Sequence, residues 1–187
     1  MPELSPYLPY WLLGVLAAVE IYASRVRRGD AQAQFDPSFV PIILLIGGGY
    51  GIAFNLVRPG HGGPGLGAWA GWAGAALTLA GAVLRVWSVA VLGRYFTYVV
   101  RVSPDQKVVD TGPYRWVRHP SYSGALLMAA GIGLSLRHAW PLLIILATSF
   151  LAYLIRMGVE ERALAEGIGE PYRAYMRRTR RLIPFLW

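Results

Sequence analysis

The chain is organised around residues 112–124, GPYRWVRHPSYSG, which place a basic, aromatic and turn-rich stretch between two long apolar segments. Gly112-Pro113 favours a turn, and Pro120 biases His119 away from the helical region, so we expect a helix to begin near Pro120. The arginines and the histidine of this stretch can grip an anionic group, and its tyrosines and tryptophan can flank a flat ring. The stretch is therefore either a ligand-binding wall or a positively charged loop with aromatic side chains at a membrane interface.

The composition is that of an integral membrane protein. Of the 187 residues, 55% are hydrophobic and only 15% are charged, and the mean hydropathy is +0.41. A soluble domain of this length has more charge and shorter apolar runs. The chain has no cysteine, and its three histidines lie far apart in the sequence, which argues against a disulfide or a metal site. We expect the net charge of +8 to serve anionic lipid and membrane orientation, not nucleic acid.

Five apolar segments predict an all-α bundle of five transmembrane helices, forming a single domain over residues 1–187. Three of them lie within residues 1–92, and the rest of the chain, residues 93–187, forms a second half with a helical hairpin at 121–157. The polar residues 158–187 are interpreted as an amphipathic segment on the cytosolic surface. The predicted spans are residues 7–24, 38–57, 67–92, 121–136 and 140–157.

The basic residues are distributed unevenly over the loops. Fifteen of the eighteen follow the first span, separate the third from the fourth, or lie from Arg156 onward, whereas Arg58 and Arg137 lie on the other side. The positive-inside rule then places the N-terminus outside and both polar segments in the cytosol. The loop before the fourth helix and the C-terminal segment are therefore expected to form a pocket together.

Two charged residues lie within predicted spans, Glu20 in the first and Arg85 in the third. They either pair inside the bundle or extend separately to the headgroups, and we favour the second interpretation.

The glycines of the spans indicate close helix packing. We expect Gly47 and Gly51, whose spacing is typical of small-residue contacts, to pack closely against a neighbouring helix. We also expect Gly67, Gly71 and Gly74 to give the third helix a smooth face.

Arg156, Glu160 and Glu161 lie where the fifth span leaves the membrane. Arg156 and Glu160 are four residues apart and share one face of a helix. If this ion pair were exposed, it would stabilise the protein by only a few tenths of a kcal/mol. Embedded in the membrane it would be costly to keep, which favours a functional role. We predict that both side chains face the pocket walled by residues 112–124.

Residues 112–124 and the segment that begins at Arg156 resemble the signature of the isoprenylcysteine carboxyl methyltransferase family. The resemblance is carried by residues 112–124 and by the later run Arg156-x-x-x-Glu160-Glu161-x-x-Leu164, which continues through Gly169-x-x-Tyr172-x-x-Tyr175 to Leu182-Ile183-Pro184. It covers roughly residues 85–185. Two separate motifs, in the same order and on either side of a helical hairpin, make the match specific.

The resemblance implies S-adenosyl-L-methionine as the methyl donor, held in a pocket that opens to the cytosol. It implies a catalytic role for Arg156 and Glu160, with Arg156 facing the substrate and Arg101 as a further candidate. By the family pattern, the cofactor would be bound by Gln106, Lys107, Val108, Val109, Tyr114, His119, Pro120, Ser121, Tyr122 and Glu160. His119 or a nearby arginine would suit the carboxylate of the cofactor, Glu160 its ammonium group, and the tyrosines its adenine ring.

The methyl acceptor is left open. The family resemblance implies carboxyl O-methylation of an isoprenylcysteine-like or other lipophilic substrate. A phospholipid amine or a small thiol is the alternative, and an amine would need a base, for which Glu161 is the candidate. A sterol-type reductase that uses NADPH and a non-enzymatic membrane scaffold are the remaining hypotheses. A scaffold would have no reason to gather the two polar segments around one cavity.

Overall fold

The computed structural model describes residues 5–26, 39–57, 61–97, 102 and 105–184, and over these residues the chain is helical. The only β-pairing among them consists of two isolated bridges, Gly65 with His138 and Val117 with Arg180. The predicted all-α class is therefore confirmed. The elements are α1 (Leu8–Val26), α2 (Phe39–Leu56), α3 (Trp69–Leu92), α4 (Pro120–Ser135), α5 (Ala139–Gly167) and α6 (Glu170–Arg178), with single 3-10 turns at Gly93–Tyr95 and Gly112–Arg115.

Each of the five predicted segments coincides with a helix, and the predicted start of α4 is confirmed. His119 precedes α4 with φ −124° and ψ 54°, outside the helical region, and Pro120 is the first helical residue. The helix that contains the fifth predicted span is longer than the span itself. The helix continues beyond Met157 to Gly167 because residues 158–166 are mostly good helix formers and include no proline. Within residues 158–187, the first ten belong to α5, and α6 is a separate helix.

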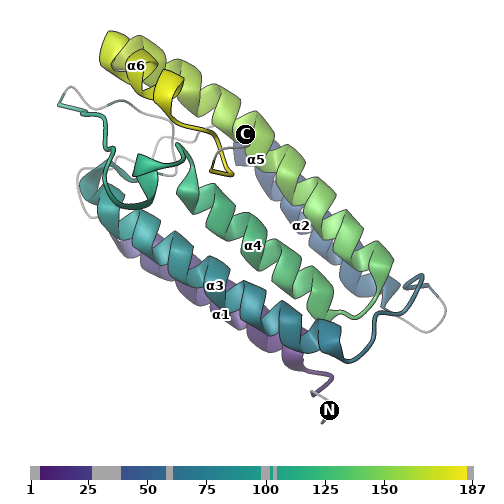
Figure 1. Cartoon of the computed structure of the whole chain (residues 1–187). Coiled ribbons are helices and arrows are strands. Elements are labelled where there is room, and N and C mark those ends of the chain that lie inside the picture. The colour runs from purple at the N-terminus through teal and green to yellow at the C-terminus, as the bar shows by residue number, and fades with distance from the viewer. Residues whose placement is uncertain (1–4, 27–38, 58–60, 98–101, 103–104, 185–187) are drawn as a thin grey trace.

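The helices form a bundle with α4 at its centre. Figure 1 shows α3 and α1 along one side of α4, and α5 and α2 along the other. The loop that contains residues 105–119 and the short helix α6 lie together at one end of the bundle, opposite the N-terminus. The two polar segments thus lie at the same end, as the charge distribution predicted. Arg58 and Arg101 lie outside the described residues.

Glycines bring α3 and α4 into backbone contact. A Cβ atom on Gly81 would lie 2.5 Å from the carbonyl oxygen of Gly124, and one on Gly131 would lie 2.5 Å from the carbonyl oxygen of Gly74. The members of each helix are seven residues apart, about two turns, so the two contacts lie on one face of each antiparallel helix. The predicted smooth face of the third helix is confirmed at Gly74, which packs in this way.

The prediction for Gly47 and Gly51 was wrong. A Cβ atom on either would meet nothing within 4 Å, because both lie on the outer face of α2. The close contact of this helix is made by Gly49, where a Cβ atom would overlap Thr148 of α5. The glycine cluster therefore does support helix packing, but through the residue between the two predicted ones.

The bundle is apolar outside as well as inside. Met128, Ile132 and Ile145 are completely buried, while Trp11 and Val83 are 74% and 69% exposed. Such an exposed apolar surface is expected where lipid is the solvent. Among the described residues, two helices are long and apolar enough to cross a membrane, Trp69–Tyr95 and Ala139–Gly167, and Val40–Leu56 is a shorter apolar helix.

Arg85 does not extend to the headgroups, and that preferred interpretation was wrong. Its guanidinium lies 2.8 Å from the carboxylate of Glu20 on α1, and Arg85 is only 5% exposed. The same guanidinium donates to the backbone carbonyl and the hydroxyl of Ser121 at 3.1 and 3.0 Å. The pair inside the bundle, which was the alternative, is the observed arrangement.

Candidate functional site

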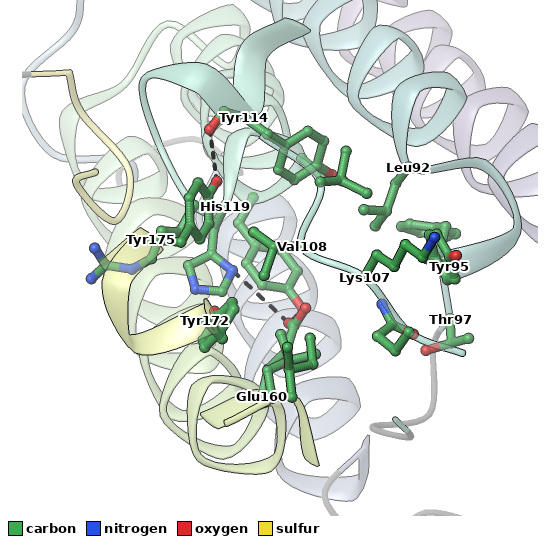
Figure 2. A pocket seen from close by; sticks show the side chains of 18 of the residues that line it. Leu92, Tyr95, Thr97, Lys107, Val108, Tyr114, His119, Glu160, Tyr172 and Tyr175 are labelled. Carbon is green, nitrogen blue, oxygen red and sulfur yellow. Dashed lines mark hydrogen bonds and ion pairs between the residues drawn. The ribbon is translucent and has the colours of Figure 1, made fainter. Parts of the chain in front are cut away.

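A cavity opens at the polar end of the bundle, between α5, α6, the start of α4 and the loop that leads to it. It encloses about 860 Å³ of space between protein atoms, including its open mouth. In Figure 2, Leu92, Tyr95, Thr97 and Lys107 lie on one side of it, and Tyr114, His119, Tyr172 and Tyr175 on the other.

The cavity gathers almost all of the predicted site residues. Pro120 is the exception, because it is completely buried at the start of α4 and does not line the cavity. Arg101 lies outside the described residues. The predicted residues that do line the cavity are Gln106, Lys107, Val108, Val109, Tyr114, His119, Ser121, Tyr122, Arg156 and Glu160.

Sequence reasoning missed nine further residues of the lining. Tyr172 and Tyr175 are three residues apart on α6, a spacing that places both rings on the face turned towards the bundle. That spacing was the available signal. Arg118 lies within the stretch 112–124 and Leu164 within the later run that resembles the family signature, so both had a signal in the sequence. The other five carried none: Leu92, Tyr95, Phe96, Thr97 and Ile168.

The wall formed by the 3-10 turn Gly112–Arg115 depends on a backbone turn that glycine permits. Gly112 has a φ of 56°, and a Cβ atom at this position would lie 3.0 Å from Val91 on α3. The turn buries Tyr114, whose carbonyl oxygen accepts a hydrogen bond of 2.7 Å from the hydroxyl of Tyr175. The loop is therefore fixed to α3 on one side and to α6 on the other.

Arg156 and Glu160 lie on the cavity face of α5, one turn apart. Arg156 is 4% exposed, and one oxygen of Glu160 accepts a hydrogen bond of 2.8 Å from the hydroxyl of Tyr122. The ring of Tyr122 stacks between those of His119 and Tyr153, with centroid distances of 5.4 and 5.0 Å. The start of α4 and the middle of α5 are thus held together by stacked rings next to the cavity.

Glu161 lies at the centre of a buried cluster and does not line the cavity. Its carboxylate accepts from Arg118 at 2.9 Å, from His119 at 3.2 Å and from Arg181 at 2.8 Å. Both oxygens are therefore occupied by donors, and the side chain is only 5% exposed. The arrangement argues against Glu161 as a base towards an amine acceptor, because donors bind both of its oxygens and it is not among the residues that line the cavity.

The segment after α6 is fastened to the loop before α4. The backbone amides of Arg118 and His119 donate to the carbonyl oxygens of Arg180 and Arg181, at 2.7 and 3.0 Å. Ser123 donates through its hydroxyl to the carbonyl oxygen of Leu182 at 2.6 Å. The side chain of Arg118 adds a hydrogen bond to the carbonyl oxygen of Met176 at 3.0 Å. This segment is therefore a backing layer for the wall of the cavity.

The tyrosines in the loop and on α6 are neutral hydrogen-bond donors. Burial raises the pKa of Tyr114 above its ordinary value, and the neighbouring carboxylate of Glu160 adds to the shift. Burial also raises the pKa of Tyr172 and of Tyr175. Among the described residues, no group of three acidic, histidine or cysteine side chains could hold a metal ion. The cavity therefore combines neutral phenols, one histidine, one carboxylate and several cations with apolar side chains.

Comparison with known proteins agrees with this description. A sequence model of the isoprenylcysteine carboxyl methyltransferase (ICMT) family matches residues 74–166. A probable protein-S-isoprenylcysteine O-methyltransferase of Oryza sativa subsp. indica is 29% identical over the aligned region. This region covers 62% of the chain and 61% of that relative. The protein-S-isoprenylcysteine O-methyltransferase of Saccharomyces cerevisiae is 31% identical over a region that covers 60% of the chain and 48% of that relative.

The fold is also found in a solved structure. The eukaryotic intramembrane Ras methyltransferase ICMT matches 97% of the chain with a TM-score of 0.65, at 20% sequence identity, and the match covers 69% of that protein. The α1 and α2 helices, which lie outside the region of the family sequence model, are thus included in the structural match.

Proposed function

Because the chain belongs to the isoprenylcysteine carboxyl methyltransferase family, we propose that it is a membrane methyltransferase that esterifies the carboxylate of a lipophilic acceptor. The acceptor we favour is an isoprenylcysteine-like carboxylate, as the names of the curated relatives suggest. S-adenosyl-L-methionine is the proposed donor. The observation that carries the proposal is the single cavity lined by both of the segments that resemble the family signature.

The chemistry of the lining fits S-adenosylmethionine. The donor has a flat adenine ring, a cationic sulfur, an ammonium group and a carboxylate. Tyr114 supplies a ring, Glu160, held by the hydroxyl of Tyr122, supplies a negative charge, and Lys107 at the exposed rim supplies a positive one. Gln106, Val108, Val109, His119 and Ser121 would complete the cofactor site. Pro120 would contribute by starting α4 and so placing Ser121 and Tyr122.

When bound, S-adenosylmethionine would supply a methyl group on a positively charged sulfur, which passes to an acceptor oxygen as the sulfur becomes a neutral thioether. A carboxylate acceptor is already ionised at neutral pH, so no side chain has to remove a proton. The protein then contributes position and the exclusion of water. Arg156 is buried and fixed on α5 beside the cavity, and it can hold a carboxylate through two parallel hydrogen bonds.

The same reasoning favours a carboxylate over an amine as the acceptor. An amine would have to lose a proton during the reaction. The base predicted for that reaction, Glu161, is enclosed by Arg118, His119 and Arg181. A buried arginine such as Arg156 would also repel an ammonium acceptor.

We further propose that all five long helices cross the membrane, with the N-terminus outside and the cavity facing the cytosol. The charge bias of the loops and the apolar outer surface of the bundle support this orientation. Accessibility labelling of single cysteines introduced in this cysteine-free chain would test it. A cysteine at Ser5 should react from outside intact cells, and a cysteine at Glu170 should react only after the membrane is opened.

Calorimetric titration of the purified protein with S-adenosylmethionine and with S-adenosylhomocysteine tests the proposed function. We expect saturable binding of both, followed by transfer of labelled methyl groups to prenylated cysteine and not to phospholipid amines or thiols. Binding of NADPH in place of either ligand would contradict the proposal. Binding of the cofactor with transfer only to an amine or a thiol would overturn the proposed acceptor and retain the donor.

A further inference from the structure

The ring of His119 lies between two consecutive glutamates of α5 that have opposite surroundings. Its Nε2 atom is 3.2 Å from an oxygen of Glu161, and its Nδ1 atom is 4.0 Å from an oxygen of Glu160. The ring is only 4% exposed. Figure 2 shows the ring next to Glu160, which lines the cavity. Glu161, on the other side of the ring, belongs to the buried cluster, so the ring connects the cluster to the cavity.

The contact with Glu161 determines which nitrogen of the ring carries hydrogen. The carboxylate of Glu161 accepts from Arg118 and Arg181 and has no hydrogen to give. The Nε2 atom of His119 must therefore be the donor in this contact. The subsite requires the neutral form of the imidazole, in which hydrogen on Nε2 leaves Nδ1 with a lone pair. The separation of 4.0 Å between Nδ1 and Glu160 is also too long for a hydrogen bond between them.

Nδ1 and the carboxylate of Glu160 are then two acceptors at the cavity with a gap between them. A nitrogen atom about 2.9 Å from both would make an angle of about 90° to them, which the tetrahedral hydrogens of an ammonium group can serve. Tyr122 holds Glu160 in place by donating to the nearer oxygen. This arrangement suits a primary ammonium group, so of the two partners predicted for the cofactor carboxylate, His119 or a nearby arginine, it favours the arginine.

We propose that Glu161 is a positioning residue that acts through His119: it fixes the ring with hydrogen on Nε2, so that Nδ1 and Glu160 together accept from a primary ammonium group of the bound ligand. This inference rests on the proposed function, because the α-amino group of S-adenosylmethionine is the primary ammonium that would occupy the subsite. The carboxylate of the cofactor would consequently lie away from His119, towards the cationic part of the lining that includes Lys107.

The subsite is tested by combining a side-chain change with a ligand change. His119→Gln keeps a donor near the position of Nε2 and removes the Nδ1 acceptor. We expect it to weaken binding of S-adenosylhomocysteine by roughly tenfold or more. It should change by less than about threefold the binding of the analogue in which hydrogen replaces the α-amino group. Glu170→Gln, at an exposed glutamate of α6, is the matched control and should leave both affinities unchanged. An equal loss for both ligands would overturn the subsite.

The positioning role is tested by nitrogen-15 NMR of the protein labelled at histidine. The chain has three histidines, and the signals that disappear in His119→Gln belong to His119. We expect hydrogen on Nε2 and none on Nδ1 in the unaltered protein, and a mixture of the two forms in Glu161→Gln, whose amide can donate as well as accept. Hydrogen on Nδ1 in the unaltered protein would sink the inference. So would a Glu161→Gln variant that loses affinity with the ring unchanged.

The two proposals fail in different ways. If the folded protein bound neither S-adenosylmethionine nor S-adenosylhomocysteine, the proposed function would fail and this inference with it. If both ligands bound but the amino-free analogue responded to His119→Gln as S-adenosylhomocysteine does, only the subsite would fail. Should Glu161→Gln not fold, the spectrum of the unaltered protein and the ligand pair with His119→Gln still decide the question.

Discussion

Arg85 and Glu20, which are 65 residues apart in the sequence, meet at 2.8 Å inside the bundle, and Arg85 also binds both oxygens of Ser121. Ser121 lines the cavity. The first helix, which lies outside the region matched by the family sequence model, therefore supports the proposed cofactor site through one arginine. The carboxylate of Glu20 provides a counter-charge for the guanidinium of Arg85, which is buried between α3 and α4.

Glu20→Ala is accordingly expected to destabilise the protein and weaken binding of S-adenosylhomocysteine. Removing one partner of a fully buried pair costs about 3–5 kcal/mol, but Glu20 is 36% exposed, so we expect about 1–3 kcal/mol. Thermal unfolding in detergent and calorimetry would measure the two effects. Glu170→Ala, which breaks an exposed pair with Arg177, is the control. A control as destabilised as Glu20→Ala would contradict the special role of the buried pair.

Gly81→Ala should separate α3 from α4. The added methyl group would meet the backbone of Gly124 and Met128 at 2.5 and 2.7 Å, and a backbone cannot move aside as a side chain can. We expect a loss of about 1–3 kcal/mol in the free energy of unfolding. Gly47→Ala is the matched control, because it adds the same methyl group to α2 with nothing within 4 Å. It should be neutral or stabilise its helix by up to about 1 kcal/mol. The melting temperature of Gly81→Ala should be lower than that of Gly47→Ala, and the reverse order would contradict this prediction.

Arg156→Gln should lower turnover while S-adenosylhomocysteine still binds. The substitution keeps part of the side-chain volume but removes the charge and the paired donors that would hold an acceptor carboxylate. We expect a decrease of roughly a hundredfold in kcat/KM. Calorimetry and methyl transfer to prenylated cysteine, on the same preparation, provide the two readouts. Loss of cofactor binding with acceptor affinity retained would assign Arg156 to the cofactor instead.

Tyr175→Phe should loosen the cavity wall, since it removes the hydroxyl that donates to the carbonyl oxygen of Tyr114. A hydrogen bond of this kind contributes about 1 kcal/mol. We expect a small decrease in melting temperature and a several-fold decrease in affinity for S-adenosylhomocysteine. Tyr22→Phe, at an exposed position on α1, should change neither quantity. An unaltered affinity in Tyr175→Phe would show that the wall does not depend on this contact.

Stability should be lost in strongly alkaline solution. Burial raises the pKa of Tyr114, Tyr172 and Tyr175 in the folded protein, whereas an unfolded tyrosine titrates near pH 10. Below about pH 10 the three phenols are protonated in both states and contribute no pH dependence. Above it only the unfolded state releases protons, so stability falls by up to about 1.4 kcal/mol per pH unit for each tyrosine. Melting temperatures between pH 8 and pH 11 would measure this fall.

The alkaline fall should become less steep in Tyr114→Phe, which has one titrating phenol fewer. If the slope of this variant equalled that of the unaltered protein, Tyr114 would not be among the groups responsible.

Much of the fold could be predicted because each long helix corresponds to a run of apolar residues in the sequence. The starts of the helices were close to the predicted ones, and Pro120 marked the first residue of α4. How far α5 continues beyond its predicted span could not be read from the sequence, because a change from apolar to charged residues marks both the end of a helix and the emergence of a helix from a membrane. No local signal distinguishes the two, since residues 158–166 favour a helix in either case.

The candidate site was predictable where a residue faces the cavity from a motif, and not where its role depends on a distant partner. Tyr114, His119 and Glu160 came from motifs and do lie around one cavity. The surroundings of Glu161 could not be foreseen, because Arg181 lies twenty residues further on and approaches it only through the path of the chain after α6. For the same reason, the pairing of Glu20 with Arg85 could not be decided from a sequence that places each near the end of a helix.

The hydrogen bonds between the loop and the last segment have a consequence for biosynthesis. The side chain of Arg118 binds carbonyl groups that follow it by 58 and 61 residues. A ribosome therefore delivers the loop well before it delivers the partners of that loop. During this interval α3 and α4 can already associate through their glycines, while Arg118 and His119 still lack their backing. The nascent protein should thus enter the membrane as a helical hairpin without an assembled site, and it should acquire affinity for its cofactor only once residues 175–182 have left the exit tunnel.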